Sequence, residues 1–291
     1  MKKEFNITGT CLPGQHYMMD ASAKLAAVMA MIEAGKYFTI SRPRQYGKTT
    51  MLAGLHNLLG ANPKYLPIRL DLQGVDAHWY SSDSAFAEMF VKKMHQALGP
   101  KHPSLAADVH SMTPKSINMD SLSDLISEMA YATDAHLVLL MDEVDSSSNF
   151  DPFLRFLGML RAKYLRKLEG LDASFHSVVL AGVHHIKSLK LKVRSDDTAQ
   201  YNSPWNIAAD FKVEMSFRPH EIAPMLKEYS QAEGVEIDVP AFAEKLYYYT
   251  SGYPFLVSKL CKTIAEDLLP QKAEKTAMLA PVYYHSDTEN T

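Results

Sequence analysis

Short apolar segments alternate with helix-like segments over the first 218 residues, and this alternation constrains the fold more than any other feature. Runs of apolar and β-branched residues predict strands at residues 37–41, 65–72, 136–142, 176–181 and 211–217. Patterns typical of amphipathic helices lie between them, at residues 49–59, 84–98, 121–131 and 152–168. Because parallel strands need long crossover connections, which helices supply, we expect an α/β fold with a central parallel sheet covered on both faces.

After residue 218 the pattern becomes entirely helical. Helices are expected at residues 219–233, 239–249 and 253–268, with a break at Ser251 and Gly252. The length of 291 residues suits about two domains. We therefore expect an α/β domain with an amino-terminal strap at residues 1–218, a small helical domain at residues 219–269 and a polar tail at residues 270–291.

Composition excludes several classes of protein. The longest apolar run, residues 25–32, is far shorter than the roughly 20 residues of a membrane helix. Glu4 and Asn6 lie where a secretory signal would be apolar, so we expect a cytoplasmic protein without a membrane partner. Cys11 and Cys261 lie at opposite ends of the chain, without partners at the spacing of a zinc site, and are expected to be packing residues.

Charge is unevenly distributed along the chain. The formal net charge of −3 is not that of a protein that binds nucleic acid over its whole surface. Residues 155–194, however, contain nine lysines and arginines against two acidic residues. This stretch predicts either a solvated helix face or a surface for phosphate or nucleic acid.

The sequence SRPRQYGKTT occupies residues 41–50, between the first predicted strand and an amphipathic helix. A loop in this position presents backbone N–H groups to an anion, and the following helix adds its free amides. Gly47, Lys48 and Thr49 match the end of the Walker A pattern, in which lysine reaches the β and γ phosphates and the hydroxyl binds Mg²⁺. We expect Lys48 to be a partly exposed charge. Arg42 stands where the strict pattern has its first glycine, so the triplet alone does not identify the site.

Residues 138–141 form an apolar segment that ends abruptly in Asp142 and Glu143. Carboxylates are costly inside a core, whereas at the carboxyl end of a parallel strand they reach the crevice where α/β proteins bind ligands. Asp142 would then hold Mg²⁺, directly or through water, and Glu143 would orient and polarise the attacking water. The alternative is a strand that leaves the sheet through acidic residues. Asp145 is expected to cap the next turn.

Six segments together resemble the bacterial and archaeal AAA-like ATPases of the additional-strand P-loop group, which are related to the STAND-type signalling ATPases. They are FNITGTCLPGQHYMMD, RPRQYGKTT, LLMDEVD, VVLAGVHHIKSL, SPWNIAADF and TSGYPFLVSKLC, and the resemblance runs from about residue 5 to residue 267. Such ATPases carry an arginine-rich loop in place of the first glycine. The resemblance implies a parallel sheet in the order 5-1-4-3-2, a helical lid after the fifth strand, and ATP with Mg²⁺ between them. Longer relatives continue into a nuclease-like domain, so we expect a shortened member whose effector is missing or supplied by another polypeptide.

The resemblance also implies a set of nucleotide contacts. The loop residues expected to bind the nucleotide are Arg44, Gln45, Tyr46, Gly47, Lys48, Thr49 and Thr50. Gly252, Tyr253 and Pro254 match a turn that brings the lid against the adenine, with Gly252 at positive φ and Pro254 starting a helix, although a plain helix break fits equally well. Tyr17 can pack beside the base or in the core.

Two further positions complete the predicted catalytic group. His184 follows the fourth predicted strand, where a sensor residue would contact the γ phosphate, and Arg194 is the candidate arginine finger on a neighbouring subunit. A surface histidine and a surface arginine are the alternatives.

We thus predict an ATPase, slow on its own, that couples nucleotide state to lid position in signalling or regulation, together with a protein partner or a homo-oligomer. A non-hydrolysing ATP-dependent interaction switch remains open, as does an ATPase subunit that acts on nucleic acid through residues 155–194.

Overall fold

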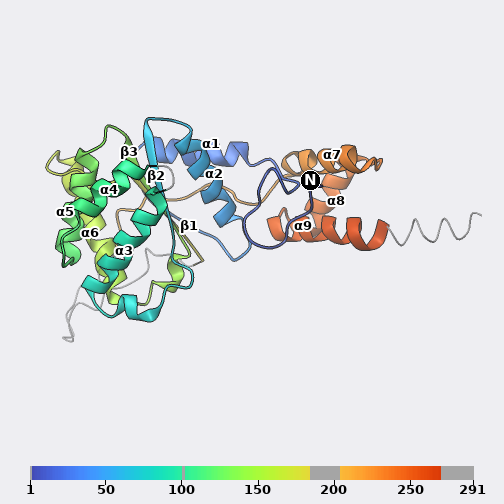
Figure 1. The fold of residues 1–291 in the computed structure, drawn as a ribbon. Coiled ribbons are helices and arrows are strands. Elements are labelled where there is room, and N and C mark those ends of the chain that lie inside the picture. The colour runs from blue at the N-terminus through green and yellow to red at the C-terminus, as the bar shows by residue number, and fades with distance from the viewer. Residues whose placement is uncertain (1, 100–101, 184–203, 270–291) are drawn as a thin grey trace, which may run out of the picture. The chain divides into compact units, whose positions relative to one another are not determined.

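The computed structural model describes residues 2–99, 102–183 and 204–269, which divide into two compact units (Figure 1). The sheet unit consists of Ala23–Arg44 and Lys48–Glu214. The helical unit consists of Met1–Ser22, Gln45–Gly47 and Met215–Thr291. The amino-terminal strap therefore belongs with the helices, whereas the sequence analysis assigns it to the α/β domain. Among the described residues, no helix combines the length and apolar character that crossing a membrane requires.

Four parallel strands form the sheet, in the order β1-β4-β3-β2. They are β1 (Tyr37–Ser41), β2 (Tyr65–Asp71), β3 (His136–Asp142) and β4 (Ser177–Gly182). Every residue of β3 after His136 is buried, as expected for a central strand with a helical layer on each face. The continuous apolar sequence of residues 137–141 reflects this double burial.

The sheet is covered on both faces. One core combines alternate residues of the strands with side chains of four helices, α3 (Asp83–Leu98), α4 (Pro103–Met112), α5 (Met119–Tyr131) and α6 (Asp151–Leu168). Helix α2 (Lys48–Gly60) contacts β2, β3 and β4 with residues outside that core, and Leu25 of α1 (Ser22–Glu33) lies over Gly54 of α2. The predicted α/β architecture with a central parallel sheet is confirmed.

Local sequence explains where several helices begin. The side chain of Ser82 accepts a hydrogen bond from the Ala85 N–H at 3.1 Å, which caps α3. Asn118 and Ser121 form a reciprocal capping box at the start of α5, and Pro103 occupies the first turn of α4. Helices α1 and α4 are absent from the sequence analysis, whereas α2, α3, α5 and α6 lie within two residues of the predicted bounds.

The fifth strand predicted at residues 211–217 is not formed in the described part of the chain. Pairing with β1 is limited to one isolated bridge between Phe38 and Ala209. Beyond it, the Arg42 guanidinium donates to the Val213 carbonyl oxygen at 2.8 Å and lies 5.4 Å from the ring centre of Phe211. The Arg42 side chain thus occupies a carbonyl oxygen that backbone pairing of a fifth strand would use. In the part of the chain that the structure describes, the sheet has four strands.

The helical unit contains α7 (Pro219–Glu233), α8 (Val239–Thr250) and α9 (Pro254–Thr263), followed by the π-helical turn η4 (Ile264–Leu268). These bounds agree closely with the three predicted helices. Phe5 and Tyr17 of the strap belong to the same hydrophobic core as Ile222, Met225 and Val257. This shared burial explains why the strap groups with the helices.

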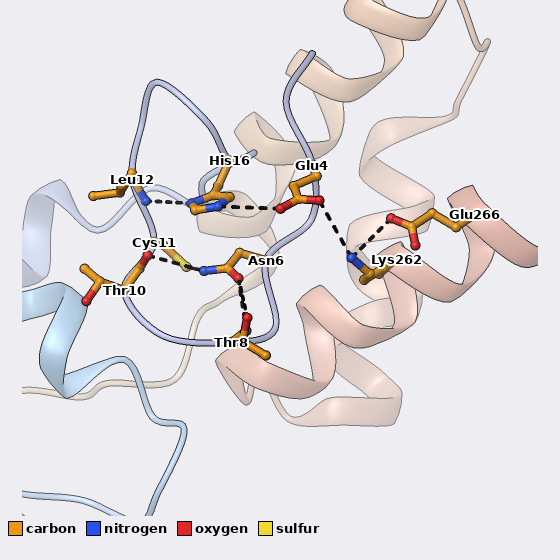
Figure 2. Close-up of polar contacts among 9 residues, drawn as sticks. All are labelled: Glu4, Asn6, Thr8, Thr10, Cys11, Leu12, His16, Lys262 and Glu266. Atoms are coloured by element: carbon orange, nitrogen blue, oxygen red, sulfur yellow. Dashed lines mark hydrogen bonds and ion pairs between the residues drawn. The ribbon is translucent and has the colours of Figure 1, made fainter. Parts of the chain in front are cut away.

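Polar contacts fix the strap on itself and on α9 (Figure 2). The backbone N–H of Leu12 donates to His16 Nδ1 at 2.8 Å, which closes a turn within the strap. Glu4 lies 3.9 Å from the Lys262 amino group, which also pairs with Glu266 one turn further along at 3.3 Å. The strap is therefore an ordered part of the helical unit.

The two cysteines, which the sequence analysis expects to be packing residues, are thiols in separate surroundings. Cys261 is buried in the core of the helical unit, and burial raises its thiol pKa to about 12. Cys11 is half-buried, and its Sγ accepts a hydrogen bond from Asn6 Nδ2 at 3.6 Å (Figure 2).

Candidate functional site

The loop between β1 and α2 carries the first group of predicted site residues. Strand β1 ends at Ser41, and α2 begins at Lys48. Gln45 and Gly47 both adopt positive φ, at 62° and 75°. The loop therefore turns sharply just before the helix, and the backbone N–H groups of the first turn of α2 come directly after it.

Lys48 is buried, with 5% of its surface exposed, rather than partly exposed as the sequence analysis expects. Its Nζ atom donates to the carbonyl oxygens of Arg42 and Pro43, each at 3.0 Å. Burial lowers the pKa of this amino group, and the nearby carboxylates of Glu143, Asp142 and Asp145 act in the opposite direction. The ammonium group is thus held by the loop and faces an acidic strand end.

Asp142 lies at the carboxyl end of β3 with 1% of its surface exposed. Its carboxylate accepts hydrogen bonds from the Thr49 side chain and from the Glu143 N–H, the latter at 3.0 Å. Burial raises its pKa despite these bonds. A threonine hydroxyl beside one carboxylate is a donor set that suits Mg²⁺, which takes only one or two carboxylates when phosphates supply further oxygens.

Glu143 directly follows β3 in a left-handed backbone conformation, with φ of 53°. The residue is half-buried, and burial raises the pKa of its carboxyl group, with the charge of Asp142 adding to this effect. The Lys48 amino group opposes the shift. A carboxylate of raised pKa is a better proton acceptor than an exposed one, which is the property required of a general base.

The remaining loop residues are divided between the two units. Arg44 and Thr50 belong to the sheet unit, and Gln45 and Tyr46 to the helical unit. Within the helical unit, the Tyr46 ring lies 4.7 Å from that of Tyr253, and the Tyr46 hydroxyl is 3.3 Å from Ser216 Oγ. The predicted nucleotide loop therefore passes from one compact unit to the other and back.

The predicted turn at residues 252–254 has the expected local geometry. Gly252 has φ of 71°, and Pro254 begins α9. A Cβ atom at Gly252 would overlap the carbonyl oxygen of Phe217, whose N–H donates to the Gly252 carbonyl at 2.8 Å. Only glycine fits this close approach between two backbone segments.

Tyr17 lies in the core of the helical unit. Its ring is 5.0 Å from that of Phe5 and 5.4 Å from that of Tyr229, and its hydroxyl donates to Glu233 at 3.3 Å. Of the two roles that the sequence leaves open, these contacts are those of core packing. His184 and Arg194 lie outside the described residues.

Sequence reasoning misses Arg69 and Asp71 around the strand ends, and it misses one contact of Asp145. Arg69 of β2 lies 4.0 Å from the Asp142 carboxylate, and Asp71 pairs in register with Asp142. Asp145 accepts a hydrogen bond from the Val183 N–H, just beyond β4, instead of only capping a turn. The sequence could have indicated Arg69 and Asp71, because they are polar residues near the end of the otherwise apolar strand β2.

The basic stretch is largely engaged within the sheet unit where it is described. Lys163 donates to Asp172 at 3.0 Å, and Arg155 to Asp83 at 2.8 Å. Lys167 donates to the carbonyl oxygens of Phe175 and His176. Lys187, Lys190, Lys192 and Arg194 lie outside the described residues. Lys163, Lys167 and Arg155 therefore take part in contacts within the sheet unit.

Comparisons with known proteins give a family and a distant structural likeness. No curated protein matches the sequence. A solved structure of the ORC2 protein from Aeropyrum pernix, described as ADPNP–ADP complexes, is similar with a TM-score of 0.48 at 13% sequence identity. The likeness covers 94% of this chain and 65% of that one, so the chain spans less than two thirds of the length of the solved protein. The model of the AAA-like domain family matches residues 10–285, nearly the whole sequence. This chain therefore belongs to the AAA-like family of P-loop ATPases.

Proposed function

We propose that this chain binds ATP with Mg²⁺ and hydrolyses the β–γ phosphoanhydride bond. One observation carries the proposal. Four neighbouring groups lie together in the sheet unit, those of Lys48, Thr49, Asp142 and Glu143. The charges of Asp142 and Glu143 act on the Lys48 amino group, and the Thr49 hydroxyl donates a hydrogen bond to Asp142. A cation, a hydroxyl–carboxylate pair and a carboxylate of raised pKa are the groups that phosphoryl transfer to water requires.

Lys48 would bind the β and γ phosphates. Its ammonium group donates to two backbone carbonyl oxygens, which are neutral acceptors. Phosphate oxygens make stronger, charge-assisted hydrogen bonds, and a polyanion would offset the cost of burying the charge. Backbone N–H groups at the start of α2 would add further donors to the same anion.

Thr49 and Asp142 would hold Mg²⁺, which neutralises charge on the phosphates when it is bound. Glu143 would accept a proton from a water molecule as the water oxygen forms a bond to the γ phosphorus. The bond from that phosphorus to the bridging oxygen then breaks, and ADP leaves. The raised pKa of Glu143 supports this role, because it increases the affinity of the carboxylate for the proton.

Glu143→Gln tests the proposal. The amide keeps the shape of the side chain but cannot accept the proton, so we expect turnover to fall by a factor on the order of 10² to 10⁴. Affinity for Mg·ATP should stay within about threefold, because Lys48, Thr49 and Asp142 remain. The measurement is phosphate release at saturating ATP, with affinity measured by calorimetry.

Glu88→Gln is the matched control, since Glu88 is exposed on α3. Equal rates in the wild type and in Glu143→Gln would reject hydrolysis at this site and would favour the non-hydrolysing switch. We expect slow turnover in the isolated chain, because an arginine supplied by a partner or by a second copy often completes such sites.

We further propose that nucleotide binding is coupled to the helical unit through the loop. Gln45, Tyr46 and Gly47 belong to that unit, and the rings of Tyr46 and Tyr253 are in contact within it. Nucleotide that orders the loop would thereby also stabilise the turn before α9.

Tyr253→Ala tests this coupling. We expect it to reduce the increase in melting temperature that Mg·ATP produces by about half, because binding must then order a loop that has lost its partner ring. Tyr248→Ala removes an exposed tyrosine from α8 and is the control. Equal thermal shifts in both variants would contradict the coupling.

A further inference from the structure

The turn that follows Glu143 is attached by side chains to elements on both sides of β3. Ser146 Oγ lies 3.2 Å from the Leu72 carbonyl oxygen just beyond β2, and Ser147 Oγ lies 2.5 Å from the Tyr80 hydroxyl. On the other side, the Asp145 carboxylate accepts the N–H of Val183, which follows β4. Since β3 lies between β2 and β4, the turn is held from both neighbouring strands.

The Asp145 carboxylate lies close against Gly182 at the end of β4. A Cβ atom built on Gly182 would lie 2.7 Å from Asp145 Oδ2 and 3.0 Å from its carboxyl carbon. Gly182 is not among the described residues with positive φ, so backbone conformation does not require it. A side chain at this position would displace the carboxylate that accepts the Val183 N–H.

Glu143 depends on this turn for its orientation. A non-glycine residue in the left-handed region is strained, and it persists only where the surroundings enforce it. The Ser146 N–H donates to the Glu143 carbonyl oxygen at 3.2 Å, and Ser146 Oγ donates to the same oxygen at 2.8 Å. Movement of the turn is therefore transmitted directly to the backbone of Glu143.

We propose that Asp145 is a positioning residue, which ties the turn to the end of β4 and thereby sets the place of the Glu143 carboxylate. This inference rests on the proposed hydrolysis. Asp145 need not touch the nucleotide, since its effect passes through the backbone of the turn. Its hydrogen bond to Val183 secures the β4 side, and the two serines secure the β2 side.

Two substitutions separate the hydrogen bond of Asp145 from its charge. Asp145→Asn keeps an oxygen that can accept the Val183 N–H, whereas Asp145→Ala removes the acceptor. Phosphate release and Mg·ATP affinity are measured for both. We expect Asp145→Ala to lower kcat by about 10- to 100-fold with affinity within about threefold, and Asp145→Asn to retain at least about half of the wild-type kcat.

The packing of Asp145 against Gly182 can be tested by measuring stability instead of ATP hydrolysis. Gly182→Ala introduces a methyl group where the carboxylate lies, so it should destabilise the wild type, while in the Asp145→Ala background the vacated space accommodates it. A double-mutant cycle in urea unfolding should therefore show coupling between the two positions.

The outcomes distinguish this inference from the proposed hydrolysis. If Glu143→Gln abolishes turnover and Asp145→Ala leaves kcat unchanged, the positioning role is wrong and hydrolysis stands. If Asp145→Asn is as slow as Asp145→Ala, the hydrogen bond is not the cause and the inference is overturned. If Glu143→Gln leaves turnover unchanged, the proposed hydrolysis fails, and the inference fails with it because there is no catalytic carboxylate to position.

Discussion

Lys48 and Lys167 are two lysines of the sheet unit with similar local bonding at opposite ends of the sheet. Each Nζ atom donates to two backbone carbonyl oxygens, those of Arg42 and Pro43 for Lys48 and those of Phe175 and His176 for Lys167. Burial lowers the pKa of both amino groups, to about 8 for Lys167. Hydrogen bonding alone does not separate a lysine that binds a ligand from one that packs.

The surroundings of the two lysines differ. Three carboxylates, those of Asp142, Glu143 and Asp145, act on Lys48. Lys167 lies 5.4 Å from the ring centre of Tyr37 and 5.5 Å from that of Tyr164, and burial is the one cause that shifts its pKa. The Lys48 amino group therefore lies near carboxylates, whereas that of the half-buried Lys167 lies near aromatic rings.

Among the substitutions that test this difference, Lys48→Ala should have the largest effect. We expect it to weaken Mg·ATP binding by roughly 100-fold, because charge-assisted hydrogen bonds to two phosphates are lost. Lys167→Ala should change the affinity less than about twofold. Titration calorimetry on both variants makes the test, and equal affinity in Lys48→Ala and the wild type would reject the assignment of the loop.

Asp142→Asn should have an intermediate effect, on the affinity for ATP in the presence of Mg²⁺. The amide can still accept from Thr49 and from the Glu143 N–H but is a poor ligand for Mg²⁺, so we expect affinity for ATP with Mg²⁺ to fall about tenfold. With a chelator present, affinity should stay the same or rise slightly, because a negative charge near the phosphates is gone. Asp134→Asn, at an exposed position before β3, is the control. Equal losses with and without Mg²⁺ would contradict a role in metal binding.

Lys167→Met should have the smallest effect, on the pH dependence of stability. The pKa of Lys167 is about 8 in the folded protein and 10.5 ordinarily, so between these pH values the unfolded chain binds a proton that the folded chain does not. The free energy of unfolding therefore rises with pH across this window. Methionine removes this contribution. The slope of the unfolding free energy against pH, measured by urea unfolding from pH 8 to 10, should then fall by up to the equivalent of about one bound proton. Identical slopes would show that Lys167 keeps its ordinary pKa.

Much of the fold follows from local sequence, and the failures have physical causes. Strands β1 and β3 have the bounds that their apolar runs predict. Helix α1 is apolar on most sides and buries even Lys24, so it shows little of the periodic pattern that reveals a surface helix. The alternating residues 211–217 resemble a strand, but the Arg42 guanidinium takes the Val213 carbonyl oxygen, and no local pattern discloses a partner 171 residues away.

The site was predictable where its residues are neighbours in sequence. Lys48 follows a strand and begins a helix, and Asp142 and Glu143 end an apolar run, so position alone indicates chemistry. The contributions of Arg69 and Asp145 depend on which strands lie beside β3. That order is a property of the assembled sheet. The burial of Lys48 was likewise missed, because exposure depends on what the loop packs against.

The left-handed conformation of Glu143 affects how an inactive form of this protein should be made. Asparagine and glycine adopt positive φ more readily than glutamate does, so replacing Glu143 with either relaxes the backbone as well as removing the carboxylate. A nucleotide complex captured with such a variant would therefore have a turn with less backbone strain than the native turn. Glutamine retains the original backbone preference, so it is the substitution to choose for capturing the bound state.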